Sequence, residues 1–159
     1  AHFGARVRAM TVIGPGGCSI KGRPRLDFIR YGDVKDDPKA YRHALKHNLL
    51  QLMLKHPESV DEDVLDMQHD NVERAKFNSR NGSAQPILPE NLGKAGCRAQ
   101  LIYGKDDPTA FPSIEHRADL IREYVPDLKL QVLPNVGHWA MFEGADDVNR
   151  HIIDFHKDA

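Results

Sequence analysis

The stretch 101–108 (LIYGKDDP) decides the fold of this chain. Its apolar start predicts a buried strand, and its glycine predicts a turn at which Asp106 or Asp107 presents a carboxylate. A second stretch, 128–139 (LKLQVLPNVGHW), predicts another strand, and the turn after it presents His138. The two turns are about 30 residues apart, the length of a β-α-β unit, which brings the carboxyl ends of its parallel strands to one edge of a sheet. We therefore expect an acid and a histidine, two members of a nucleophile–histidine–acid triad, at that edge.

Length and composition indicate a globular chain with one core. The chain has 159 residues, of which 40% are hydrophobic and 28% charged, and its formal net charge is −1. This charge gives no general attraction for nucleic acid or an acidic membrane, and no apolar run approaches the roughly 18 residues of a membrane span. We expect neither nucleic-acid nor membrane partners, and no metal or other cofactor.

Cysteine use favours a reducing compartment. Cys18 and Cys97 form no C-x-x-C pair, and two cysteines do not make a disulfide framework. Residues 1–10 contain two arginines and no apolar core, unlike a signal peptide. We therefore expect free thiols and a cytoplasmic location.

The N-terminal residues predict a core strand. Residues 6–13 (RVRAMTVI) have a strand composition and lead into a sharp turn at 14–17 (GPGG). Because the chain starts almost directly with this strand, we expect that a preceding part of the fold is missing. Residues 1–24 are interpreted as the first core strand and its turn.

Residues 25–86 are interpreted as a helical insertion. Asp36 or Asp37 can cap a first helix, Pro38 suits its first position, and the helix should end near residues 55–57. The turn residues at 78–86 (NSRNGSAQP) mark the expected end of the insertion.

A second helix is expected inside this insertion. Ser59 and Glu62 have the spacing of a capping box, which predicts that the helix begins at Ser59. Its apolar stripe, weaker than that of the first helix, includes Val60, Val64 and Met67.

Residues 87–159 predict an α/β core. Strands are expected at 98–103 and 128–133, and Ser113 can cap a helix at 114–124 between them. A last helix should have Asp146 or Asp147 in its first turn, where a carboxylate suits the helix dipole. Its expected core face consists of Val148, Ile152 and Phe155.

These motifs resemble the second half of an α/β-hydrolase. That family ends with a strand, a Gly-x-x-Asp turn, a helix, a strand, a Gly-His turn and a final helix. Here the two turns are 104–107 (GKDD) and 137–138 (GH), and 7–17 resembles the strand and turn that come earlier in the fold. The resemblance implies an α/β fold class, namely a partial α/β-hydrolase fold with parallel strands, crossover helices and a helical cap insertion at 25–86. It is closest to capped meta-cleavage-product hydrolases and their esterase relatives.

The resemblance implies a role for each site residue. His138 would be the general base and then the general acid, and Asp107 would orient its imidazole. Asp106 is the rival acid, although the Gly-x-x-Asp spacing favours Asp107. Trp139 would line the substrate pocket or pack on the final helix. Arg74 and Arg80 could bind a substrate carboxylate, with solvated helix arginines as the commoner alternative.

The nucleophile departs from the family pattern. No G-x-S-x-G motif occurs in the chain, so the serine would come from a missing N-terminal half, and the chain alone should be inactive on its small-molecule substrate. Cys18 is a weak alternative nucleophile, because it lacks the strand–elbow–helix context. His43 and His47 lie four apart on one helix, as in H-E-x-x-H, but Ala44 stands where the glutamate would be, which favours a surface pair.

A different class of function stays open. The chain could be a non-catalytic fragment or interaction module whose first strand presents an unpaired edge. It would then pair with its missing half or form a homo-oligomer.

Overall fold

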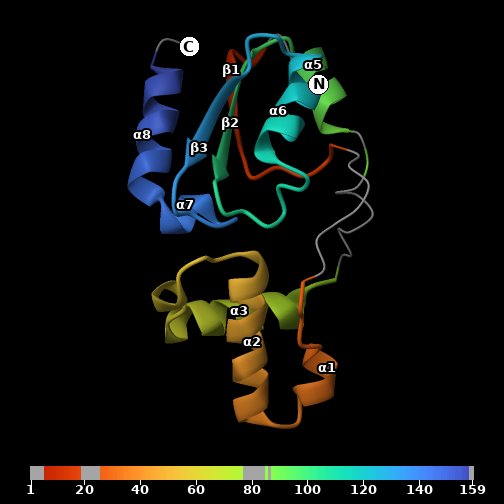
Figure 1. The fold of residues 1–159 in the computed structure, drawn as a ribbon, viewed down its shortest axis with the longest axis vertical. Coiled ribbons are helices and arrows are strands. Elements are labelled where there is room, and N and C mark those ends of the chain that lie inside the picture. The colour runs from red at the N-terminus through yellow and green to blue at the C-terminus, as the bar shows by residue number, and fades with distance from the viewer. Residues whose placement is uncertain (1–5, 19–25, 77–84, 86, 158–159) are drawn as a thin grey trace.

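The computed structural model describes residues 6–18, 26–76, 85 and 87–157. Figure 1 shows an α/β core and, beyond its lower edge, a separate block of helices α1, α2 and α3. In the core, helix α8 (Ala145–His156) covers one face of the sheet, and helices α5 (Leu88–Ala95) and α6 (Ile114–Arg122) cover the other. The core therefore has three layers.

The sheet of the core consists of parallel strands. Its order is β1 (Ala9–Ile13), β2 (Arg98–Gly104) and β3 (Lys129–Leu133). Strand β2 pairs with both neighbours, and α6 forms the crossover between β2 and β3. The parallel strands with a crossover helix confirm the expected fold class.

Alternation along β2 builds a core on each face of the sheet. Leu101 and Tyr103 pack in the cluster that includes Ile114, Ala118 and Ile121 of α6. Ile102 points the other way and packs with Leu133 of β3 and Val148 of α8. A strand buried on both faces explains why 101–103 is continuously apolar.

Side-chain caps fix where helices α2 and α6 begin. Asp37 caps α2 (Pro38–Leu52) by accepting from the backbone N–H groups of Lys39 and Ala40. Ser113 caps α6 in the same way by accepting from the N–H of His116. These two predictions are confirmed, and for the first helix the structure selects Asp37 over Asp36.

The expected start of the second helix is wrong. Helix α3 (Glu62–Arg74) is capped by Asp61, which accepts from the N–H of Val64 at 2.9 Å. Ser59 ends the 3-10 turn η2 (Pro57–Ser59), where Pro57 occupies the first position. Asp61, and not Ser59, caps the helix because it lies one residue before the first turn, where its carboxylate reaches a free backbone N–H group.

The helical block has a small core of its own. The members of this cluster are Leu45, Leu49, Leu54, Val60, Val64 and Leu65. Met67, which was expected in the α3 stripe, is 43% exposed, whereas Leu65, which was not, is buried. The stripe is displaced because α3 packs Val64 and Leu65 against α2.

Three α-helices were not expected from the sequence. Helices α1 (Tyr31–Val34) and α7 (Ala140–Glu143) are single turns, and the short helix α5 contains Gly93, which weakens a helix signal. The expected boundary at 78–86 lies almost entirely outside the described residues, so the limits of the insertion stay a prediction. Among the described residues, no helix combines the length and apolarity needed to cross a membrane.

Candidate active site

The turns that follow β2 and β3 lie directly against each other. The N–H of Lys105 donates to the carbonyl of Leu133 at 2.8 Å, and the N–H of Asp106 donates to the carbonyl of Val136 at 3.0 Å. A Cβ atom on Gly104 would lie only 2.1 Å from the carbonyl oxygen of Gly137. Glycine at 104 therefore permits the close approach that brings the aspartate turn and the histidine turn together.

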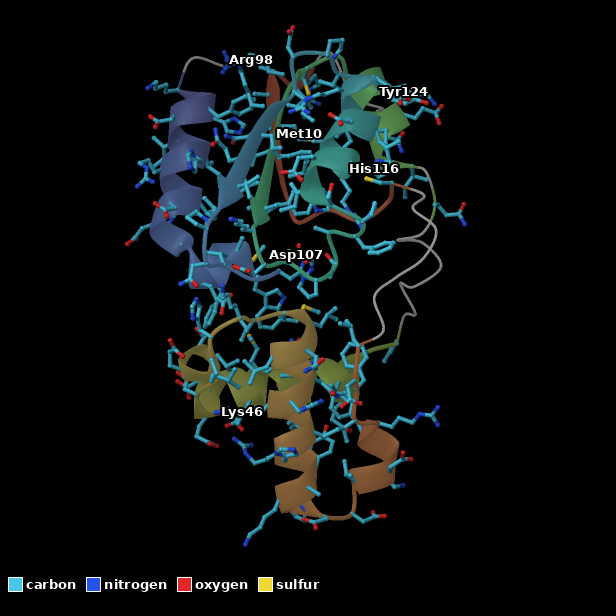
Figure 2. All side chains as sticks on the ribbon, viewed as in Figure 1. Met10, Lys46, Arg98, Asp107, His116 and Tyr124 are labelled. Atoms are coloured by element: carbon cyan, nitrogen blue, oxygen red, sulfur yellow. The ribbon has the colours of Figure 1, made fainter. Side chains whose placement is uncertain are left out.

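The structure brings Asp107 and His138 into contact. His138 Nδ1 lies 2.8 Å from Asp107 Oδ2, with the Asp107 side chain 0% and the His138 side chain 23% exposed. With the carboxylate as acceptor, Nδ1 carries the proton, and Nε2 is the nitrogen left for proton transfer. Figure 2 shows Asp107 at the edge of the core that faces the helical block.

Thr109 supports this pair from the aspartate turn. Its N–H donates to Asp107 Oδ1 at 2.7 Å, and its Oγ1 lies 3.2 Å from His138 Nδ1. Both oxygens of the Asp107 carboxylate are therefore engaged, one by the backbone and one by the imidazole. Such a carboxylate is held in one orientation, as an orienting acid requires.

Asp106 has a different partner. Its Oδ2 lies 2.6 Å from Nζ of Lys55, which belongs to the loop after α2. Asp106 thus links the core to the helical block and does not contact the imidazole.

Trp139 lies between the core and the helical block. It is the residue before α7 (Ala140–Glu143), and its ring packs against the cluster of Leu45 and its neighbours. The backbone N–H of Trp139 donates to the carbonyl of Met53 at 2.8 Å. Trp139 therefore packs on the helical block, directly after the histidine.

The predicted arginine site is not assembled among the described residues. Arg74 is in the last turn of α3, where its side chain is 81% exposed and pairs with Asp70 four residues earlier. This is the solvated arrangement that the sequence left as the alternative. Arg80 lies outside the described residues.

Cys18 does not have the surroundings of a nucleophile. It is buried in the core cluster, and burial raises the pKa of its thiol. The Arg117 guanidinium acts in the opposite direction but is the smaller influence. Cys18 is therefore a core residue that favours the unreactive thiol form.

The histidine pair on α2 has no metal-site geometry. The ring centroids of His43 and His47 are 6.1 Å apart. His47 Nε2 contacts the carbonyl of Asp27 at 2.5 Å. Across the described ranges, no group of three or more histidine, cysteine, aspartate or glutamate side chains could hold a metal ion.

Sequence reasoning missed Arg117, which stabilises the aspartate turn. Its guanidinium donates to the carbonyls of Thr109 at 2.6 Å, Phe111 at 3.2 Å and Pro15 at 3.1 Å. It thereby connects the aspartate turn to the turn after β1. A lone arginine on a helix carries no sequence signal for this role, because its partners are backbone carbonyls of distant loops.

Tyr103 binds the same carbonyl of Pro15. Its hydroxyl donates to this oxygen at 2.9 Å, and burial raises the pKa of the phenol well above its ordinary range. Tyr103 therefore remains a neutral donor.

Comparisons with known proteins support the fold described above. No family model matches the chain. A 2-hydroxy-6-oxo-6-phenylhexa-2,4-dienoate hydrolase from Burkholderia cepacia is 37% identical over 73 residues, which cover 46% of this chain and 24% of that enzyme. An enzyme of the same name from Comamonas testosteroni is 27% identical over 165 residues, covering 97% of this chain and 56% of that enzyme. A solved structure of a mutant of the meta-cleavage product hydrolase CumD matches 99% of this chain and 59% of its own, with a TM-score of 0.64 and 15% identity.

The chain has a partial α/β-hydrolase fold. The resemblance to capped meta-cleavage-product hydrolases that the two turns indicated is confirmed, and the chain's homologues are meta-cleavage product hydrolases. The chain spans about half the length of the Comamonas relative, 56%. Within this partial α/β-hydrolase fold, the helical block lies between β1 and β2 in the sequence, and the His138–Asp107 pair lies at the sheet edge nearest to it.

Proposed function

We propose that this chain supplies the base and the acid of a serine hydrolase that cleaves an ester or a carbon–carbon bond next to a carbonyl. The serine would come from sequence outside these 159 residues, because the chain contains no G-x-S-x-G motif. The observation that carries the proposal is the 2.8 Å contact between His138 Nδ1 and the buried Asp107 carboxylate. The names of the relatives favour the carbon–carbon bond.

The pair has the arrangement that such a mechanism needs. His138 Nε2 accepts the proton of the serine hydroxyl while the serine attacks the carbonyl carbon of the substrate. Asp107 holds the imidazole in the required tautomer and stabilises the imidazolium that forms. His138 then gives the proton to the leaving group, and water releases the acyl group in a second step.

A hybrid enzyme tests this proposal. The part of the Comamonas hydrolase outside its match to this chain is fused to residues 1–159, and hydrolysis of a p-nitrophenyl ester and of that enzyme's own substrate is measured. We expect activity in the hybrid and none in the chain alone. His138→Ala should lower kcat by at least about 10³-fold, because the general base is lost.

The neighbouring aspartate provides the matched control. Asp107→Asn should lower kcat strongly, whereas Asp106→Asn, the same change one residue away, should leave kcat within about threefold, because Asp106 contacts Lys55 and not the imidazole. Activity that survives His138→Ala would overturn the proposal.

A non-catalytic interaction module is the second candidate. Strand β1 pairs with β2 on one side only within the described residues, and each of its five residues is partly exposed. An unpaired strand edge can pair with another chain, either the rest of the fold or a second copy.

Size-exclusion chromatography with light scattering tests this candidate. Self-association of the chain would support it, because an unpaired strand edge is the surface expected to pair. A monomer that binds no dye for exposed apolar surface would count against it.

The cytoplasmic location expected from the free thiols also remains a proposal.

A further inference from the structure

Glu143 connects the histidine turn to the helical block through backbone hydrogen bonds. Its Oε2 accepts from the N–H of Gly137 at 2.8 Å, directly before His138. Its Oε1 accepts from the N–H groups of Lys55 and His56, both at 2.8 Å. One carboxylate therefore holds three backbone donors, two from the loop that leaves α2 and one from the turn that presents the imidazole.

These donors depend on Glu143 for their hydrogen bonds. Gly137, Lys55 and His56 lie outside the helices and strands, so no regular ladder satisfies their N–H groups. A charged acceptor forms shorter and stronger hydrogen bonds than a neutral one. The Glu143 carboxylate is thus the shared acceptor that holds the two loops of this junction together.

The junction leaves no room for a side chain at position 137. A Cβ atom on Gly137 would lie 2.9 Å from Glu143 Oε2, 2.9 Å from the backbone nitrogen of Lys55 and 3.0 Å from the carbonyl oxygen of Met53. The glycine before the histidine is therefore required by packing against the carboxylate and the loop. Just beyond it, the N–H of Trp139 donates to the carbonyl of Met53, so contacts to the same loop lie on both sides of His138.

The position of Glu143 in the chain fits this task. It ends the short helix α7, and its own N–H donates to the carbonyl of Trp139 at 3.0 Å. The segment 137–143 is thus closed into a loop by the Glu143 side chain, whose carboxylate binds the N–H of Gly137. This closure restrains the peptide that carries the His138 side chain.

We propose that Glu143 is a positioning residue, which holds the His138 imidazole on Asp107 and couples that orientation to the docking of the helical block. The inference rests on the proposed role of the His138–Asp107 pair, but its test does not require catalysis. Glu143 touches no reacting atom and acts only through the backbone of Gly137 and of the 53–56 loop.

Glu143→Gln is the informative variant. A glutamine amide keeps the size of the side chain but has one acceptor oxygen, and its NH₂ group would face N–H donors on the other side. It can therefore satisfy the Gly137 side or the Lys55–His56 side, but not both. Glu123→Gln, the same change at an exposed glutamate at the end of α6, is the matched control.

The experiment is NMR on the ¹⁵N-labelled 159-residue chain. In the wild type, the amides of Gly137, Lys55 and His56 should exchange with solvent about ten- to a hundredfold more slowly than unprotected loop amides, as expected for hydrogen bonds to a charged group. The imidazole Nδ1–H of His138 should give a downfield signal from its hydrogen bond to Asp107. Glu143→Gln should speed exchange of the three amides and of this Nδ1–H by about tenfold or more, and Glu123→Gln should change neither.

Two results would overturn the inference. One is free exchange of the three amides in the wild type, a measurement that needs no variant to fold. The other is a Glu143→Gln protein in which the His138 Nδ1–H signal is unchanged although the amides lose protection. An inactive hybrid enzyme with the expected NMR behaviour would remove the proposed function but leave this role of Glu143, and an active hybrid with unchanged NMR signals would do the reverse.

Discussion

Asp106 and Asp107 are adjacent in the chain, yet their carboxylates contact different parts of the molecule. Asp106 Oδ2 lies 2.6 Å from Lys55 Nζ, and Asp107 Oδ2 lies 2.8 Å from His138 Nδ1. The first pair is 35% and 40% exposed at its side chains, whereas the Asp107 side chain is fully buried. Two neighbouring carboxylates thus serve the block–core contact and the candidate active site separately.

This difference predicts unequal costs for the same substitution. Asp107→Ala should lower the free energy of unfolding by about 1–3 kcal/mol, because it removes a buried acceptor that the N–H of Thr109 and the imidazole share. Asp106→Ala should cost at most about 1 kcal/mol, because its ion pair is solvent-screened. Urea denaturation at neutral pH measures both, and equal losses would contradict the assignment.

Glycine at position 104 should be indispensable. Gly104→Ala places a Cβ atom 2.1 Å from a backbone oxygen, which only a shift of one of the two turns can relieve. We expect a loss of more than about 3 kcal/mol or failure to fold. Gly32→Ala is the control: nothing lies within 4 Å of its Cβ position and it lies in helix α1, so it should be neutral or stabilising by up to about 1 kcal/mol. Thermal unfolding followed by circular dichroism distinguishes the two.

The raised pKa of Tyr103 predicts a stability loss in alkali. Burial keeps this phenol neutral in the folded state, while in the unfolded chain it ionises at about pH 10. Its contribution is therefore complete below about pH 10 and is lost as the pH rises further. Tyr103→Phe should cost about 0.5–1.5 kcal/mol at pH 7, from the hydrogen bond to Pro15, and this deficit should shrink near pH 11.

Denaturation curves at the two pH values check this prediction. Tyr124→Phe alters an exposed tyrosine and should leave the stability close to wild type at both. A Tyr103→Phe deficit that stays constant or grows with pH would mean that Tyr103 is not kept neutral by burial.

Cys18 should react slowly with alkylating reagents. Burial both restricts access and raises the pKa of its thiol, so the thiolate is scarce at neutral pH. In a Cys97→Ser protein, iodoacetamide labelling of Cys18 should be slower than labelling of free cysteine and should accelerate when the chain is unfolded in urea. Fast labelling of the folded protein would revive the cysteine nucleophile hypothesis. Mass spectrometry with time provides the rate.

The sequence was sufficient for the parts of the fold that local chemistry determines. The apolar run before Gly104 predicted β2, Ser113 predicted the start of α6, and the acidic pair Asp146 and Asp147 lies in the first turn of α8 as expected. In each case, the deciding residues are neighbours in the chain. Hydrophobic spacing and helix caps act over a few residues, so a short stretch of sequence is enough to predict the element.

Contacts between distant loops could not be predicted in the same way. Spacing favoured Asp107 over Asp106, but only the position of Lys55, 51 residues away, shows what Asp106 contacts. Arg117 and Glu143 bind backbone groups, which every residue has, so no residue pairing in the sequence points to them. Helix α5 was missed because it is only eight residues long and contains Gly93 in its interior, whereas Pro89 lies in the first turn, where proline is tolerated; packing of Leu92 in the core compensates for the glycine.

Trp139 is the chain's single tryptophan, and it packs against the helical block directly after His138. Its intrinsic fluorescence therefore reports on one junction rather than on the whole molecule. Loosening of the block would change the emission before far-ultraviolet circular dichroism registers any loss of helix. The protein thus contains its own optical probe of whether the block is seated beside the histidine, and no label has to be attached to use it.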